Sequence, residues 1–384
     1  MTKSLDRYIQ TIPCNVRVLP LLLSVLTVLA GCSGDDVDEQ PAPKLDIHIY
    51  APGKMEPTRS GETVKPVTGE DEIKTLQLWL YDSNTSNLLG SLNLGTTDVA
   101  SLNSTGAQSY SMELPSTFAY GPNPLVDVYV LANTTVGNCG IAAGGNATLS
   151  ELESLKIGSN YFQPTPSVPG DGLPMSGVMR RQNIVQRNDV FHLNEANLML
   201  KRAVSKIRFV FSSLTREKSL QIKKVTLDAG KMYKDEYLFL QDAPYRVGND
   251  KNTEELKLLD EISGNIATND DPTQYAYKSG ETVANYEKRI ENALSEDSKP
   301  LTASQWLYLR ESDQKLTGKI YFTVGGNGPE HTATFSMVGS DFRRNQTWIV
   351  YAYYIGSTRL VVNSVQVTNW EEKDPLAPHE IHNL

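Results

Sequence analysis

The stretch LDIHIY at residues 45–50 alternates apolar and polar side chains, and this alternation decides how the rest of the chain is interpreted. Successive side chains of a β-strand point to opposite faces of its sheet, so the pattern predicts a half-buried strand. The alternation returns in LQLWLY at 76–81 and in VDVYVLAN at 126–133. Further strands are expected at 203–211, 222–227, 319–324, 332–337, 348–355 and 360–370.

Helical signals are few. TLSE at 148–151 has the pattern of a capping box, and apolar residues at helical spacing between Val283 and Leu294 indicate a second helix. The run GGNG at 325–328 joins two expected strands, so it is interpreted as a hairpin loop and not as a phosphate-binding loop. Many strands with few short helices predict an all-β chain built from β-sandwiches.

The N-terminus has the pattern of an export signal. Three basic residues precede an apolar run at 18–29, and LAGC at 29–32 follows. The apolar run is too short for a membrane span, and LAGC resembles a bacterial lipobox. Residues 1–31 are therefore expected to be a lipoprotein signal peptide, cut between Gly31 and Cys32, with Cys32 lipidated. The alternative is a plain signal peptide with an incidental cysteine.

Removal of this leader makes the net charge of the chain more negative. Residues 1–31 carry three basic and one acidic side chain, so the net charge falls from −9 to −11. A surface of this kind argues against nucleic acid as a partner, because phosphate binding needs clustered basic residues. Cys139 would be the one cysteine left beside the lipidated Cys32, so no disulfide within the chain is expected.

The remaining chain is expected to have three parts. Residues 32–43 are acidic and rich in proline, and they are interpreted as a lipidated flexible tether. A strongly patterned strand begins near 203, after the Pro/Gly-rich run 164–177. We therefore expect an N-terminal β-sandwich domain at 44–200 and a C-terminal one at 201–384.

No pattern of catalytic residues is present. The five histidines form neither a zinc-binding motif nor a Cys/His pair, so no metal and no other cofactor is predicted. The carboxylates Glu70, Asp71 and Glu72 precede the strand at 76–81, and they are interpreted as a solvated turn. We expect the protein not to be an enzyme.

Three segments give the chain a resemblance to the FimA-type fimbrillins, the subunits of type V pili of Bacteroidota. The first combines TRSG at 58–61 with IKTLQLWLYD at 73–82. The second combines LPMSG at 173–177 with LMLKRAVSKI at 198–207. The third combines RNQTWIVY at 344–351 with VQVTNW at 365–370.

The resemblance implies two transthyretin-like β-sandwich domains in tandem and a stepwise assembly. Fimbrillins are exported as lipoprotein precursors, and a trypsin-like protease then cuts after an arginine behind the first strand. In this chain the bond between Arg59 and Ser60 matches, although Lys54 or Lys44 are alternatives. A strand from another pilin subunit fills the groove that the lost strand leaves. The donor is expected at 360–370, which could equally be the last strand of its own domain.

The expected location is the surface of the cell outer membrane, through the lipid anchor, and the fimbrium after processing. One alternative is a surface lipoprotein that binds a glycan or host ligand through exposed aromatics, for which Trp306, Tyr308, Tyr275 and Tyr277 are the residues to examine. Another is a pilus anchor subunit that is not cleaved, or a tip adhesin.

Overall fold

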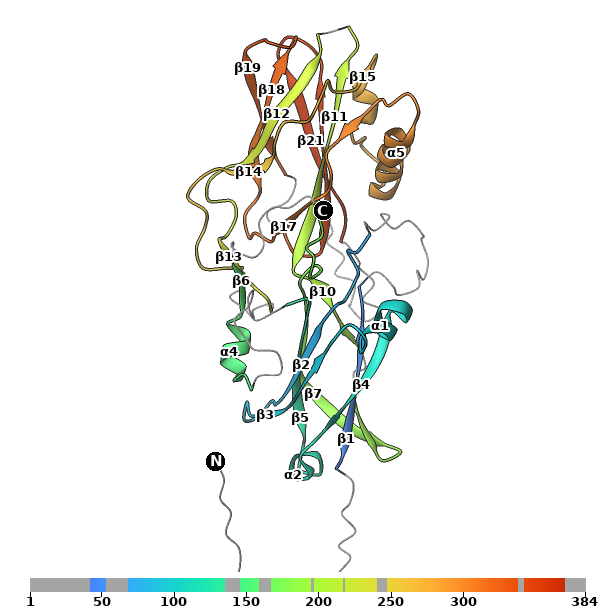
Figure 1. Ribbon diagram of the computed structural model, residues 1–384, viewed down its shortest axis with the longest axis vertical. Coiled ribbons are helices and arrows are strands. Elements are labelled where there is room, and N and C mark those ends of the chain that lie inside the picture. Colours follow the sequence, from blue (N-terminus) through green and yellow to red (C-terminus); the bar gives the residue numbers. More distant parts are fainter. Residues whose placement is uncertain are drawn as a thin grey trace, which may run out of the picture. The chain divides into compact units, whose positions relative to one another are not determined.

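The structure, a computed structural model, describes residues 42–52, 68–134, 146–158, 167–194, 197–216, 218–239, 247–337 and 342–369. Its described residues form mainly strands, with a few short helices, in sandwich-like sheets (Figure 1). The predicted all-β fold class is confirmed. The expected limits of the two domains, at 44–200 and 201–384, stay a prediction.

The N-terminal part contains one hydrogen-bonded sheet of nine strands. The order along its path is β3-β2-β5-β7-β8-β1-β4, and β9 and β10 pair with β1 and β7. The strands are β1 (Lys44–Tyr50), β2 (Leu76–Asp82), β3 (Leu88–Leu94), β4 (Ala107–Glu113), β5 (Leu125–Ala132), β7 (Met175–Arg187), β8 (Val190–Leu193), β9 (Leu198–Met199) and β10 (Lys201–Arg202).

The long strand β7 connects two groups of strands within this sheet. Its first part pairs with β5 up to Asn183, and its last four residues pair with β8. Within the first part Arg181 has a φ of +54°, at the point where the register with β5 shifts between Val126 and Val128. Such an irregularity bends a strand and increases its twist, which lets one strand serve both groups.

The C-terminal part has a second, two-layered core. A six-stranded sheet, with the path β15-β11-β20-β21 and with β16 and β17 on β11, faces a four-stranded sheet of order β14-β12-β18-β19. The strands are β11 (Val204–Leu214), β12 (Leu220–Leu227), β14 (Leu256–Leu259), β15 (Thr268–Asn269), β16 (Thr302–Ala303), β17 (Leu307–Arg310), β18 (Thr317–Val324), β19 (Glu330–Ser336), β20 (Gln346–Tyr354) and β21 (Leu360–Asn369).

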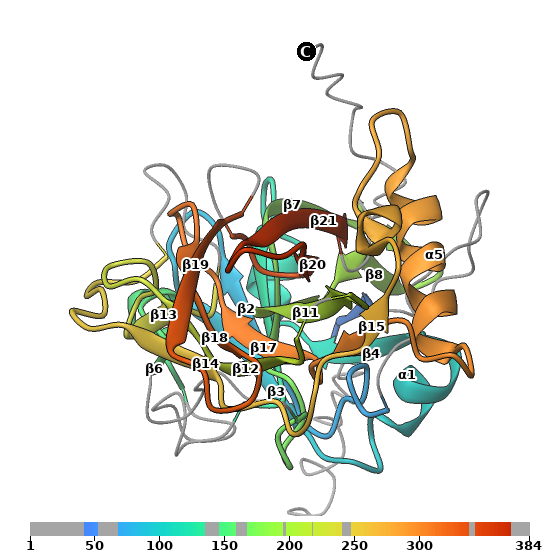
Figure 2. The same ribbon diagram turned by 90° about the horizontal axis from the view of Figure 1, so that it is seen from above.

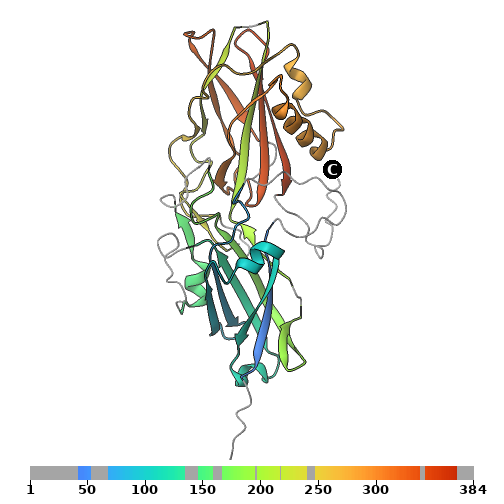
Figure 3. The same ribbon diagram turned by 45° about the vertical axis from the view of Figure 1, so that its right-hand side comes forward.

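Helix α5 (Val283–Ser295) covers the other face of the six-stranded sheet (Figures 2 and 3). On β20, Trp348 and Val350 point into the space between the sheets, while Ile349 and Tyr351 pack with Tyr286 of α5. This strand is therefore buried on both faces, which explains why its sequence is apolar almost throughout.

The remaining elements are short. The predicted capping box is present at Thr148, where α4 (Leu149–Glu153) begins, and the glycine-rich hairpin joins β18 to β19. Strands β6 (Lys156–Gly158) and β13 (Asp235–Tyr237) form a two-stranded sheet between segments far apart in the sequence. The other helices are α1 (Ala100–Thr105), α2 (Ser116–Ala119) and η1 (Pro272–Tyr275).

Candidate functional site

Strand β1 lies in the interior of its sheet. It pairs along its whole length with β4 in antiparallel orientation, and on its other side it pairs in parallel with β8 and then β9. Leu45, Ile47 and Ile49 are completely buried, as the alternation predicted. A strand with hydrogen-bonding neighbours on both sides and three buried side chains fills a place that its loss would leave open.

The opposite face of β1 makes polar contacts with its neighbour. Asp46 accepts a hydrogen bond from the hydroxyl of Ser111, and the Nδ1 atom of His48 lies 2.7 Å from the Ser109 hydroxyl oxygen. These contacts are exposed, so they contribute less to stability than the three buried side chains do. The buried face of β1 therefore accounts for most of its attachment.

The predicted lipidation and processing residues lie outside the described part of the chain. This applies to Gly31 and Cys32, and equally to Arg59 and Ser60. The alternative cut site Lys44 is described: it is the first residue of β1, and its register partners are Glu113 and Val190. A protease needs a backbone segment that can leave the fold, so this position is a poor substrate.

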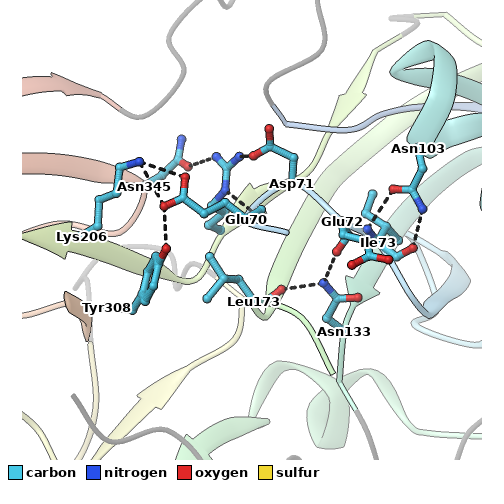
Figure 4. Close-up of polar contacts among 11 residues, drawn as sticks. Glu70, Asp71, Glu72, Ile73, Asn103, Asn133, Leu173, Lys206, Tyr308 and Asn345 are labelled. Atoms are coloured by element: carbon cyan, nitrogen blue, oxygen red, sulfur yellow. Dashed lines mark hydrogen bonds and ion pairs between the residues drawn. The ribbon is translucent and has the colours of Figure 1, made fainter. Parts of the chain in front are cut away.

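The acidic turn before β2 is not solvated, and the prediction for Glu70 and Asp71 is wrong. The carboxylate of Glu70 is completely buried, 2.9 Å from the Nζ atom of the equally buried Lys206, and it accepts a 2.6 Å hydrogen bond from the Tyr308 hydroxyl (Figure 4). Asp71 pairs with Arg202, whose Nε donates to the Glu70 carbonyl at 3.3 Å. Only Glu72 keeps an exposed carboxylate, as expected.

Burial has an electrostatic consequence for this cluster. It lowers the pKa of Lys206, because an ammonium group loses its hydration there, and the carboxylate of Glu70 acts in the opposite direction. A buried ion pair of this kind is held together by both partners, since either charge alone would be left without compensation. The cluster therefore fixes residue 70 against β11 and β17.

Two asparagines continue this attachment toward β2 (Figure 4). Asn103 accepts a hydrogen bond from the Ile73 amide at 2.9 Å and donates to the Ile73 carbonyl at 2.6 Å. Asn133 accepts from the Lys74 amide at 2.8 Å and donates to the carbonyls of Glu72 and Leu173. We call residues 70–74 the anchor segment, because ion pairs hold two of its side chains and hydrogen bonds from Asn103 and Asn133 hold its backbone.

A second buried polar cluster lies at the start of β20. Arg344 donates to the Glu311 carboxylate at 2.9 Å and to the carbonyls of Tyr237 and Leu238, and it lies 3.3 Å from Glu236. Desolvation, with Glu311 close by, raises the pKa of Glu236 to about 8, although Arg344 opposes the shift. This cluster connects β13, which carries Glu236, to Glu311 directly after β17 and to Arg344 just before β20.

The segments that carry the resemblance supply most of these contacts. Arg202 and Lys206 belong to LMLKRAVSKI, Asn345 accepts from Arg202 at 3.3 Å, and Leu173 belongs to LPMSG. Sequence reasoning missed this role. A charged residue inside the apolar run 204–211 was the available signal, because a lysine there must be buried beside a partner.

The aromatic residues considered for ligand binding are largely packed against the fold, and Tyr275 and Trp306 are partly buried on the core cluster that contains Tyr286 of α5. Tyr308 is buried beside Glu70, and Trp306 stacks below the cations of Lys206 and Arg208. Tyr277 is 39% exposed, yet its ring packs against Tyr286 and its hydroxyl donates to the Glu281 carbonyl.

The expected donor region forms the edge of a sheet. Strand β21 pairs with β20 in antiparallel orientation from Leu360 to Asn369, and β20 is its one neighbour in the described sheet. Trp370 lies outside the described residues. The hydroxyl of Ser364 also donates to the Ser336 carbonyl of β19 at 3.2 Å. Among the described strands, β21 therefore stands at the edge of its sheet.

The described ranges contain neither a candidate metal site nor a membrane-spanning helix. Within them, no group of three or more His, Cys, Asp or Glu side chains is arranged to hold a metal ion. None of the helices in these ranges is long and apolar enough to cross a membrane.

Comparison with known proteins gives a likeness of fold. No family model and no curated protein sequence matches the chain. The structure is similar to that of a candidate cell adhesion protein from Parabacteroides distasonis, with a TM-score of 0.53 and 14% identity over 85% of this chain and 97% of that one. A fimbrial assembly protein from the same species gives a TM-score of 0.48, at 12% identity over 86% and 97%.

The tip fimbrial protein Mfa3 from Porphyromonas gingivalis, truncated at its C-terminus, gives 0.47 at 12% identity over 85% and 99%. The first of these three similarities shows a shared fold, as the resemblance to fimbrillins predicted.

Proposed function

We propose that the protein is a structural subunit of a cell-surface pilus. It is exported as a lipoprotein precursor anchored in the outer membrane through Cys32, cut by a trypsin-like protease after Arg59, and polymerised by donor-strand exchange to support adhesion. Its partners are then other pilin subunits and the protease. A shared fold alone does not assign this role, so the proposal depends on the site.

The observation that carries the proposal is the place of β1. This strand is contributed by the N-terminal end of the described chain, yet it lies between β4 and β8 and buries three apolar side chains. Each buried side chain contributes about 1.5–3 kcal/mol, so the three hold about 5–9 kcal/mol. A whole domain is stable by only about 5–15 kcal/mol, so an emptied place favours the entry of another strand.

The anchor segment supports the same proposal from the other side of the cut. The predicted cleavage at Arg59 lies between β1 and residues 70–74. Because Glu70, Asp71 and Ile73 are held by Lys206, Arg202 and Asn103, strand β2 does not depend on β1 for its attachment. Loss of the first strand would therefore leave β2 in place, while β4 and β9, whose pairing among the described strands is with β1, would lose their hydrogen-bonded neighbour.

The deciding experiment determines the N-terminus on intact cells and examines the assembled material. We expect a start at Ser60 and ladders that resist SDS, and Arg59→Ala should leave a monomer on the membrane. Lys54→Ala is the matched control, which should be processed normally. A lipidated Cys32 as the sole N-terminus, with no ladders, would contradict the proposal and favour an uncleaved anchor subunit.

The donor is proposed to be residues 360–370. Strand β21 has one neighbour in its sheet, so its release breaks fewer backbone hydrogen bonds than release of an interior strand would. Cysteine pairs test this directly: Ser111→Cys in β4 of one copy and Gln366→Cys in another should form a disulfide only in ladders. Ladders that form without any crosslink from this region would point to another donor.

A surface lipoprotein that binds a glycan or host ligand is the alternative. It requires an exposed aromatic platform, and Tyr308 is unavailable for one because it is buried. Binding of an offered glycan by the uncut monomer, lost on Trp306→Ala, would favour this alternative. A tip adhesin would show both this binding and the processed N-terminus.

A further inference from the structure

Strand β1 separates two strands whose buried faces match across it. Leu45 pairs with Met112 of β4 on one side and with Phe191 of β8 on the other, and all three side chains are buried. Because β4 runs antiparallel to β1 and β8 runs parallel to it, β4 and β8 run antiparallel to each other. Direct pairing of β4 with β8 would therefore be antiparallel, the kind of pairing that is slightly more stable per residue.

The outer faces of the same two strands match as well. Asp46 pairs with Ser111 of β4 and with His192 of β8, and both of these side chains lie on the more exposed face of their strand. A slip by one residue would exchange the buried and exposed faces of a strand, whereas a sideways shift by one strand spacing keeps them. The register that β1 sets is thus one in which β4 and β8 would pair directly with their buried faces still toward the core.

Loss of β1 leaves both strands with an unpaired edge. Among the described strands, β1 is the one to which β4 is hydrogen-bonded, while β8 keeps its pairing with β7. Unpaired edges invite pairing with other chains, which is a risk for a trimmed subunit that has not yet met a donor. A shift of β4 by one strand spacing, about 4.8 Å, would bring the two edges together. The buried side chains of β4 and β8 already belong to one hydrophobic cluster, so β4 would slide over a core that both strands share.

The two ends of β4 are attached differently to the rest of the chain. Near its start, Gln108 accepts a hydrogen bond from the Leu102 amide of α1 at 3.0 Å, and α1 directly precedes β4 (Figure 1). Helix α1 is itself held to the anchor segment, through the hydrogen bonds between Asn103 and Ile73. The start of β4 is therefore fixed even without β1. Residues 110–113 at its other end are the part that is able to move, and this is the part that faces β8 across β1.

We propose that, once β1 is removed, residues 110–113 of β4 pair directly with β8 and close the position that β1 occupied until a donor strand reopens it. The inference rests on the proposed function and adds a closed waiting state of the trimmed subunit. In this state Met112 lies opposite Phe191, and Ser111 lies opposite His192. The trimmed subunit then presents no unpaired edge at this position to unrelated chains, and a donor enters only by separating β4 from β8.

A cysteine pair distinguishes the open state from the closed one. In the uncut protein Ser111 and His192 lie on either side of β1, two strand spacings or about 9.5 Å apart, whereas a disulfide needs Cα atoms within about 7 Å. In the closed state they are opposite each other on adjacent strands, at about 4.5–5.5 Å. Ser111→Cys/His192→Cys, made in the full chain with Cys139→Ser, should therefore form the disulfide only after trimming by trypsin and departure of the cut strand. Mass spectrometry of the trimmed monomer measures both events.

The matched control is a pair that flanks a strand which trimming does not remove. Lys224 and Thr332 lie on either side of Tyr321 of β18, at the same separation of two strand spacings. Lys224→Cys/Thr332→Cys, with Cys139→Ser, should stay unbridged before and after trimming. A synthetic peptide of residues 44–50, added to the trimmed protein before oxidation, should suppress the disulfide of the test pair, because it occupies the position that β4 would otherwise close.

The outcomes separate this inference from the proposed function. A cut strand that stays bound to the trimmed protein would overturn the proposed function, and the closed state with it. Departure of the strand without a disulfide would overturn the closed state alone, because β4 and β8 would then remain apart. A disulfide that forms equally in the uncut protein would also overturn it, and so would a trimmed protein without a cooperative thermal transition, since loss of β1 would then unfold the sheet.

Discussion

The first and last described strands of this protein, β1 and β21, take different positions in their sheets. Strand β1 has partners on both sides and three completely buried side chains, while β21 has one partner among the described strands. Alternation of apolar residues alone did not distinguish them. Loss of β1 would therefore open an interior place, whereas displacement of β21 would uncover one neighbouring strand.

The largest expected effect tests how strongly the buried pair of Lys206 and Glu70 holds the anchor segment, which is the part of the chain expected to stay in place when β1 is lost. Lys206→Met leaves the buried Glu70 carboxylate without its cation, and we expect a loss of about 3–5 kcal/mol in the free energy of unfolding. Lys223→Met removes an exposed pair with Glu261 and should cost at most about 1 kcal/mol. Urea unfolding measures both. Equal small losses would mean that Glu70 does not hold the segment.

The next effect compares the two strands directly. Ile47→Ala in β1 removes a completely buried side chain and should cost about 2–5 kcal/mol, because a cavity remains between the neighbouring strands. Val362→Ala in β21 removes a partly buried one and should cost about 1 kcal/mol. Thermal unfolding of the uncut protein gives the difference. A larger loss for Val362 would reverse the comparison.

The pH dependence of the free energy of unfolding tests the cluster of Glu236 and Arg344, which lies just before β20, the strand that pairs with β21. The raised pKa of Glu236, about 8, means that the folded protein keeps a proton that the unfolded chain releases near 4.5. This contribution is fully present below pH 4.5 and is lost as the pH rises to about 8, with a slope of at most about 1.4 kcal/mol per pH unit. Glu236→Gln should flatten this part of the curve, measured by urea unfolding at successive pH values.

The smallest effect separates the two faces of β1. His48→Ala removes an exposed contact with Ser109 and should change the free energy of unfolding by less than about 0.5 kcal/mol. It should also leave assembly unchanged, since the buried face fills the place. A loss as large as that of Ile47→Ala would show that the polar face contributes equally to the attachment of the strand.

Much of the fold followed from the sequence because strands with one buried face have a period of two residues. The strand at 45–50 is of this kind, whereas the strand at 76–81 was predicted from its alternation although the fold buries both of its faces. The helix from Val283 followed from apolar residues at helical spacing. Position within a sheet could not be predicted in this way, because register and neighbours arise from contacts between distant segments. The same reason explains the error at Glu70: its partner Lys206 is far away in the sequence, and three adjacent carboxylates ordinarily lie in water.

The parallel pairing of β1 with β8 has a consequence for the order of folding. Lys44 pairs with Val190 and Tyr50 with Met199, so β1 is synthesised well before its partners on this side. Pairings of such large sequence separation form slowly. Strand β1 therefore completes its pairing with β8 and β9 late, and the link through β1 that joins β4 to the rest of the sheet is complete only then.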